Sequence, residues 1–165
     1  MKFSVVMATY NGSRYILEQL ESIKNQTRPV DEVIICDDRS QDNTVEMVQS
    51  FIERNDLAGW QISVNEQNLG YANNFHSGML KTTGDIIVFS DQDDVWLPDR
   101  IEAMEKSFTE NPQVQALYSE FELFYESDDV ARISSPVLKA MSFDGSLTLA
   151  PFWPGRPILV LRFRA

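Results

Sequence analysis

The chain has 165 residues, 43% hydrophobic and 24% charged, a composition that fits one globular domain and excludes disordered and fibrous proteins. Its formal net charge of -11 at pH 7 argues against a nucleic-acid partner, because such binding needs clustered Lys and Arg. The single cysteine, Cys36, excludes an internal disulfide framework and fits a reducing compartment. No segment approaches the ~18 apolar residues of a membrane-spanning helix, so we expect a cytoplasmic protein, at most peripheral to a membrane.

Short apolar runs alternate with amphipathic patterns from the first residues to about residue 112. The apolar runs predict strands over 3–8, 33–36 and 85–89, and a weak apolar alternation predicts a third strand over 60–64. Apolar residues repeating every three or four positions predict helices over 13–26, 42–52, 72–79 and 98–108. We expect Asp42 to cap the second helix, Gly84 to follow the third, Pro98 to open the fourth and Asn111 with Pro112 to stop it.

Four strand-then-helix units in succession predict an α/β fold, with a mostly parallel sheet covered by helices on both faces. In such sheets ligands bind outside the carboxyl ends of the strands. The turns after three predicted strands are polar, at 9–12, 37–38 and 91–94. We therefore expect these turns to converge at one edge of the sheet.

The pattern weakens beyond about residue 113. The run 114–124 predicts one or two strands, and 126–129 a turn. No acidic residue follows Asp144, while three of the nine arginines lie in the final ten residues. The composition therefore changes near residue 146, without a linker that would define a second domain.

The segment Ser90 to Trp96 has three carboxylates in four positions directly after a predicted strand. Like charges beside a core are costly unless something compensates. A solvated turn that caps the next helix is one interpretation, and a bound cation is the other. Asp91 and Asp93 can face one ion if the loop is extended, and Mg²⁺ or Mn²⁺ accepts such ligands together with phosphate oxygens. The second interpretation predicts a metal site that neutralises charge on a departing diphosphate.

Two other turns carry residues suited to binding a nucleotide. Tyr10 is either a half-buried ring or a platform on which a nucleobase stacks. A carboxylate of the pair Asp37 and Asp38 can accept hydrogen bonds from a ligand's N–H or hydroxyl groups. Trp96 is interpreted as core packing, and His76, the only histidine, as a partly exposed helix residue. A Ser-His-Asp triad and a zinc cluster are therefore not predicted.

Three stretches in order give the chain a resemblance to the glycosyltransferase family 2 catalytic domain, of GT-A (Rossmann-like) fold: "SVVMATYNGSRYILEQLESIKNQT", "DEVIICDDRSQDNT" and "NLGYANNFHSGMLKTTGDIIVFSDQDDVWLPDRIE". The resemblance runs from about residue 2 to 110, and "SDQDDVWLP" is most similar to bacterial rhamnosyltransferase-type and cell-surface polysaccharide members. It implies a single, incomplete family domain over 1–165. Residues 1–112 would form its nucleotide-sugar-binding part, and 113–165 a partial acceptor part of atypical composition.

The resemblance implies metal-dependent, inverting transfer of a sugar from a nucleoside-diphosphate donor to a carbohydrate or lipid-linked acceptor, at the inner face of the membrane. Tyr10 would stack on the base and Asp38 would bond it. Asp91 would face the ribose or the metal, Asp93 would hold the Mn²⁺ or Mg²⁺, and Asp94 would assist. The implied nucleotide-binding residues are Thr9, Tyr10, Asn11, Asp38, Asn68, Gly70 and Asp91, and the implied metal ligands are Asp91 and Asp93.

The chain departs from the family in its later part, where members usually continue well past the acidic loop. An inverting transfer needs a carboxylate general base, and none is identified among Glu120, Glu122, Glu126, Asp128, Asp129 and Asp144. One hypothesis is therefore a truncated or frame-shifted member. Two alternatives are a catalytically inactive nucleotide-sugar-binding module, and a receiver-type signalling domain, whose acidic pair should close the first strand instead.

Overall fold

The computed structural model describes residues 1–119, 138–141 and 159–162, with side chains over 1–117. The described elements, in chain order, are β1 (Phe3–Thr9), α1 (Ile16–Lys24), β2 (Glu32–Asp37), α2 (Thr44–Arg54), β3 (Trp60–Val64), α3 (Tyr71–Met79), β4 (Ile86–Ser90), α4 (Arg100–Glu110), β5 (Ala116–Ser119), β6 (Leu138–Met141) and β7 (Leu159–Arg162). The four predicted strand-then-helix units are confirmed. None of the helices in these ranges has the length and apolar character needed to cross a membrane.

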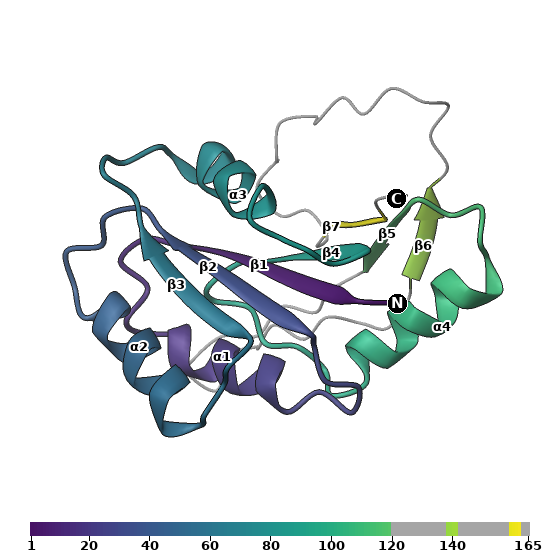
Figure 1. Cartoon of the computed structure of the whole chain (residues 1–165), viewed down its shortest axis with the longest axis horizontal. Coiled ribbons are helices and arrows are strands. Elements are labelled where there is room, and N and C mark those ends of the chain that lie inside the picture. Colours follow the sequence, from purple (N-terminus) through teal and green to yellow (C-terminus); the bar gives the residue numbers. More distant parts are fainter. Residues whose placement is uncertain (120–137, 142–158, 163–165) are drawn as a thin grey trace, which may run out of the picture.

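The described strands form one sheet in the order β3-β2-β1-β4-β7-β5-β6. β1 pairs in parallel with β2 and β4, and β2 with β3. β7 pairs antiparallel with both β4 and β5, and β5 pairs antiparallel with β6. In Figure 1, α3 covers one face of the sheet and α1, α2 and α4 cover the other. The predicted α/β class, with a mostly parallel sheet between helices, is therefore confirmed.

Both faces of β1, β2 and β4 are buried, whereas β3, at the edge of the sheet, is only partly buried. Val5 and Met7 point toward the core beneath α1, α2 and α4, while Val6 points toward α3 and packs in a second cluster with Phe75 and Phe89. Alternate side chains of a strand point to opposite faces. A strand covered on both sides is therefore apolar at most positions, which explains the nearly continuous apolar runs in the sequence.

Four predicted features at helix ends were wrong in detail. The first helix begins at Ile16 rather than Ser13, because residues 13–15 form a turn. The N-cap of α2 is Asn43 rather than Asp42. Pro98 lies before Asp99, the residue that caps α4. Gly84 is not the end of α3, which is capped by Leu80; a Cβ at Gly84 would clash with Ser4 of β1. The predicted stop at Asn111 is confirmed.

Candidate functional site

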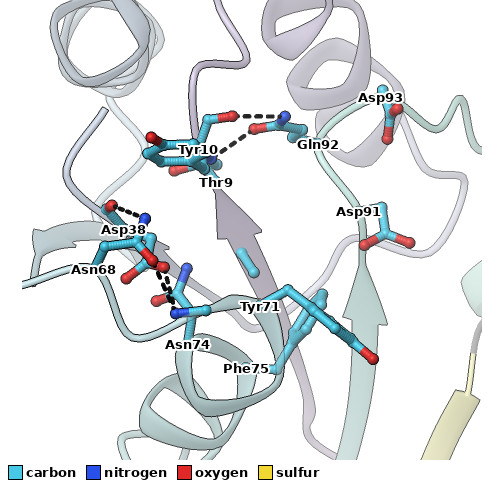
Figure 2. Close-up of a pocket in the computed structure, with 12 residues that line it drawn as sticks. Thr9, Tyr10, Asp38, Asn68, Tyr71, Asn74, Phe75, Asp91, Gln92 and Asp93 are labelled. Atoms are coloured by element: carbon cyan, nitrogen blue, oxygen red, sulfur yellow. Dashed lines mark hydrogen bonds between the residues drawn. The ribbon is translucent and has the colours of Figure 1, made fainter. Parts of the chain in front are cut away.

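A cavity of about 310 Å³ opens at the carboxyl ends of the parallel strands, beside the first turn of α3. Its wall is formed by Ala8, Thr9, Tyr10, Asp38, Asn68, Gly70, Tyr71, Asn74, Phe75, Asp91, Gln92 and Asp93. The three polar turns thus converge, as the topology predicts. The predicted nucleotide-binding and metal residues all line this cavity except Asn11, and the assisting residue Asp94 does not line it. Figure 2 shows Tyr10 and Asp38 across the cavity from Asp91 and Asp93.

Asp38 is buried, with 3% of its surface exposed, and it holds the loop that forms one wall of the cavity. One carboxylate oxygen accepts from the Leu69 amide at 2.7 Å and from Asn65 Nδ2 at 2.9 Å. The other accepts from the Gly70 amide at 2.8 Å. Asn68 Nδ2 donates to the Asp38 carbonyl at 3.2 Å (Figure 2). A carboxylate has about four acceptor sites, so Asp38 retains capacity for a donor on a ligand.

Asp37 differs from its neighbour because it is fully buried and does not line the cavity. It accepts hydrogen bonds from the Thr9 hydroxyl at 2.8 Å and from the Ser40 amide at 2.8 Å. Its carboxylate therefore ties the end of β1 to the turn after β2. Of the acidic pair, only Asp38 can reach a ligand in the cavity.

Asn11 joins the first turn to the second and makes no contribution to the cavity wall. Its backbone is in the left-handed region, with φ of 49°, where Asn is better tolerated than most residues. The Asn11 amide donates to Ser40 Oγ and its side-chain oxygen accepts from the Gln41 amide, both at 2.8 Å. Asn11 thus fixes the position of Tyr10, the next residue toward β1.

Asp42 connects the same two turns. It accepts from the Ser13 amide and from the Thr44 amide, each at 3.0 Å. Partial burial acts to raise its pKa, but the hydrogen bonds from Thr44 and Ser13 outweigh that effect and lower the pKa from 3.8 to about 2. Although it is not the N-cap, Asp42 does satisfy the first amide of α2, the interaction that the sequence predicted for a cap.

Tyr10 lies at the mouth of the cavity with 47% of its surface exposed. Its backbone is held by the side chain of Gln92, which was not predicted as a site residue. The Tyr10 amide donates to Gln92 Oε1 at 2.9 Å, and Gln92 Nε2 donates to the Tyr10 carbonyl at 3.1 Å (Figure 2). Four other lining residues were also missed: Ala8 in β1, and Tyr71, Asn74 and Phe75 in α3. For the three residues of α3, their position soon after Gly70, in a predicted helix, was the available signal.

Asp91 and Asp93 are exposed on the loop after β4. The condition stated for a shared ion, an extended loop, is not met, because residues 92 and 93 form a turn. Over the ranges that the structure describes, no group of three or more His, Cys, Asp or Glu side chains could hold a metal ion. Two carboxylates could supply only part of the coordination shell of a divalent ion, which takes six or more oxygen ligands.

A stripe of polar side chains, Gln19 and Ser22 on α1 and Gln26 just beyond its end, anchors the acidic loop that follows β4. The Ser22 hydroxyl accepts from the Trp96 amide at 3.1 Å. Gln26 donates to the Leu97 carbonyl at 2.8 Å and accepts from the Ile101 amide at 3.1 Å. Trp96 is therefore attached to Ser22 of α1. Leu97 of the loop and Ile101 in the first turn of α4 are attached to Gln26.

Gln19, on the same stripe, is fully buried. In the amide orientation that satisfies its neighbours, its nitrogen donates to the Asp94 carbonyl. Its oxygen then accepts from Trp96 Nε1 at 3.2 Å and from Ser90 Oγ at 2.6 Å. Apolar periodicity could not identify Gln19 as buried, because Gln19 is polar. The same periodicity assigns the nearby Leu17 to the buried face, although Leu17 is 37% exposed.

Arg100 places a cation beneath the acidic loop. Its guanidinium lies 4.9 Å from the ring centre of Trp96, whose burial confirms its interpretation as core packing. Within the described part of the chain, Arg100 Nε and Nη2 have no hydrogen-bond partner. Burial lowers the pKa of Arg100 to about 10, against the opposing effect of the Asp94 charge. The guanidinium therefore remains charged at neutral pH and offsets part of the loop's negative charge.

The later part of the predicted site lies outside the described residues. This applies to all six candidate general bases, Glu120, Glu122, Glu126, Asp128, Asp129 and Asp144, and to the predicted turn at 126–129. Of the run 114–124, residues 116–119 form β5.

The sequence is similar to known glycosyltransferases. WfgD of Escherichia coli, a UDP-Glc:alpha-D-GlcNAc-diphosphoundecaprenol beta-1,3-glucosyltransferase, is 27% identical over 133 residues, covering 81% of this chain and 51% of that protein. The dTDP-rhamnosyl transferase RfbG of Shigella flexneri is 39% identical over 100 residues, covering 58% of this chain and 34% of that protein. The chain spans about half or less of the length of the curated relatives it matches.

The fold is similar to a solved GT-A structure. The mannosyltransferase PcManGT from Pyrobaculum calidifontis, in complex with GDP-Man and Mn²⁺, aligns with a TM-score of 0.64 and 27% identity, covering 70% of this chain and 34% of that one. The family model described as "Glycosyl transferase family 2" matches residues 4–150. This match excludes the receiver-type alternative and confirms the resemblance seen in the three motifs. The chain therefore belongs to glycosyl transferase family 2, with the GT-A fold.

Proposed function

We propose that this chain binds a nucleoside-diphosphate sugar, together with Mn²⁺ or Mg²⁺, in the cavity at the carboxyl ends of β1, β2 and β4. The sugar would pass, with inversion, to a carbohydrate or lipid-linked acceptor in cell-surface polysaccharide synthesis. One observation carries the proposal: a cavity of about 310 Å³ with an exposed aromatic ring and a buried carboxylate on one side and two exposed carboxylates on the other. Ligand sites of at least this size are typical of small-molecule binding.

The side of the cavity formed by β1 and β2 suits a nucleoside. The exposed ring of Tyr10 offers a face on which any base can stack. Asp38 has both oxygens oriented by backbone amides and can accept a further hydrogen bond from a base. Thr9, Asn68 and Gly70 complete this wall, while Asn11 contributes by holding Tyr10 in place.

The opposite side suits a diphosphate and its metal. Although the loop turns between them, Asp91 and Asp93 both line the cavity and would supply hard carboxylate oxygens, which Mg²⁺ and Mn²⁺ prefer. Because these carboxylates are too few to complete a coordination shell, phosphate oxygens and water would supply the remaining ligands. When bound, such a metal neutralises the charge that develops on a departing diphosphate. The protein's own part is to hold both carboxylates at the cavity, through the contacts of Gln19, Ser22 and Gln26 with the loop.

The acceptor class is proposed from the relatives. The name of WfgD specifies a sugar linked to a lipid diphosphate, and an acceptor of this kind would bring the protein to the inner face of a membrane. An inverting transfer needs a carboxylate within hydrogen-bond reach of the acceptor hydroxyl. No such base is identified among the acidic residues after residue 113.

The donor proposal is tested by thermal unfolding with UDP, GDP, dTDP and CDP, each measured with Mn²⁺ and with EDTA. The descriptions of the three similar proteins mention UDP-Glc, dTDP-rhamnosyl transfer and GDP-Man. The nucleotides tested must therefore include several bases. A ligand at about 100 times its dissociation constant adds ~2.7 kcal/mol to the unfolding free energy. We expect one nucleotide to raise the melting temperature in Mn²⁺ and to lose this effect in EDTA.

Turnover of the matching nucleotide sugar then separates an enzyme from an inactive binding module. Release of nucleoside diphosphate that depends on an added acceptor identifies a transferase. Metal-dependent binding without release identifies the module instead. If no nucleotide shifts a cooperative unfolding transition, the donor site is absent and the proposal fails.

A further inference from the structure

The side chain of Gln92 joins the two sides of the cavity. It lies between Asp91 and Asp93 in sequence, yet it points across to Tyr10 (Figure 2). Its amide pairs with both backbone groups of Tyr10, accepting from the N–H at 2.9 Å and donating to the carbonyl at 3.1 Å. A side-chain amide and a peptide group each have an N–H donor and a carbonyl acceptor. The contact therefore resembles a hydrogen-bonded residue pair between two antiparallel strands.

Gly12 provides the space for this pair. A Cβ built on Gly12 would lie 2.5 Å from Gln92 Cδ and closer still to Oε1. Of the described glycines, only Gly70 has a positive φ, so Gly12 is not required by its backbone conformation. An alanine at this position could keep the backbone as it is, but it would displace the Gln92 side chain from Tyr10.

We propose that Gln92 is a positioning residue that couples the base-stacking ring of Tyr10 to the carboxylate loop. This inference rests on the proposed function. Fixing the Tyr10 backbone fixes the ring that would stack on the base, and fixing Gln92 restricts the residues on either side of it, Asp91 and Asp93. A nucleotide that contacts both Tyr10 and the carboxylate loop would therefore find them preorganised for binding. When the pair is broken, the base and the diphosphate would each bind more weakly.

The test uses two substitutions that break the pair from opposite ends. Gln92→Met keeps the length of the side chain but cannot pair with the Tyr10 backbone. Gly12→Ala leaves Gln92 unchanged in sequence, and residue 12 does not line the cavity, so the added methyl group would not itself touch a ligand there. Gln41→Met is the matched control, because Gln41 is exposed in the adjacent turn and only its backbone amide takes part in the contacts described.

Affinities are measured for uridine, guanosine, thymidine and cytidine, and for their diphosphates, in EDTA and in Mn²⁺. We expect both variants to bind the preferred phosphate-free nucleoside about fivefold more weakly, the lower end of coupling between two sites. The factor by which Mn²⁺ strengthens diphosphate binding should fall by a similar amount. The double variant should be no weaker than Gln92→Met, and Gly12→Ala should have no further effect on nucleoside affinity when Tyr10 is already alanine.

Several outcomes would overturn the coupling role alone. These are unchanged nucleoside affinity in Gly12→Ala, an unchanged effect of Mn²⁺ in both variants, or independent effects of the two substitutions. A lower melting temperature with all affinities intact would make the pair purely structural and would also overturn it. A folded wild-type protein that binds none of the four diphosphates would overturn the proposed function itself, and the coupling role with it.

Discussion

The backbone amide of Gly70 donates to a carboxylate oxygen of Asp38 at 2.8 Å, across 32 positions of sequence. The adjacent amide, of Leu69, donates to the other oxygen at 2.7 Å. A substitution of Asp38 would therefore remove a proposed ligand contact and release a wall of the cavity at the same time. The proposed roles are better tested at Tyr10 and Asp93, whose side chains are exposed.

Tyr10→Ala should weaken the binding of the preferred nucleoside diphosphate, and of any other that binds measurably, by a similar amount, about 1–3 kcal/mol, because stacking uses the face that all bases share. Tyr10→Phe is the matched control and should retain the affinity, since it keeps the ring. Isothermal titration with the four diphosphates measures both variants. A loss confined to one base would show that Tyr10 makes a base-specific contact instead.

Asp93→Asn should abolish the metal-dependent part of nucleotide binding and leave the unfolding temperature of the free protein nearly unchanged. The amide keeps the size of the side chain but removes the negative charge that attracts a divalent cation. Asp99→Asn controls for net charge, because Asp99 is exposed and makes no side-chain capping bond to α4. Titration of nucleotide in Mn²⁺ and in EDTA gives the readout, and an unchanged Mn²⁺ effect would remove Asp93 from the site.

Gln19→Leu should lower the free energy of unfolding by about 2–4 kcal/mol, because it leaves the Trp96 indole N–H, the Ser90 hydroxyl and the Asp94 carbonyl without this partner. Gln41→Leu, in an exposed turn, should change it by no more than about 0.5 kcal/mol. Urea unfolding compares the two. Equal stability of the two variants would contradict the buried network.

Gly78→Ala should destabilise the protein by about 1–3 kcal/mol, the usual cost of overpacking a core. The added Cβ would lie 2.6 Å from Val6 Cγ1 and 3.3 Å from Cys36 Sγ, where α3 meets the sheet. Val6→Ala should relieve this clash, so the double variant should be more stable than the sum of the two single effects requires. Additive effects in urea unfolding would show that α3 shifts away from the sheet instead.

Asp42 should make the free energy of unfolding depend on pH in the acidic range. Its pKa in the folded protein, about 2, lies below its ordinary value of 3.8, so its ionised form stabilises the fold. This contribution is complete above about pH 4 and is lost as the pH falls through the folded-state pKa. Asp42→Asn should therefore be less stable than the wild type at pH 7, and the difference should narrow between pH 4 and pH 2. A difference independent of pH would assign the effect to packing.

Strands β1, β2 and β4 could be predicted because each is buried on both faces and therefore mostly apolar, whereas the partly buried edge strand β3 shows only a weak apolar alternation. The helix ends were less accurate, since Asp42, Asn43 and Thr44 are all good capping residues and sequence does not decide among them. The antiparallel strands β5 to β7 are four residues each. Runs so short carry little periodicity, and their pairing depends on contacts remote in sequence.

The position of the cavity could be predicted from the topology, because polar turns after parallel strands share one edge of the sheet. The contacts that support the cavity wall could not be predicted in this way. Gln92 and Gln19 act through single amides directed at groups about 70 to 80 positions away in the chain, and neither a composition nor a repeat encodes such a pairing. Asn11, in the correct polar turn, was predicted to bind the nucleotide. It does not line the cavity but holds the turn that carries Tyr10.

β7 has a further consequence for how the chain reaches this structure. It is the only described strand that joins the parallel half of the sheet to β5 and β6, and it comes last in sequence. During synthesis the four β-α units are complete while β4 still has an unpaired edge, a surface that recruits other strands. Pairing β7 with Ile86 to Val88 of β4 thus requires a contact between distant segments, which forms slowly. This edge of β4 should be the last to become protected in a pulsed hydrogen-exchange experiment on refolding protein.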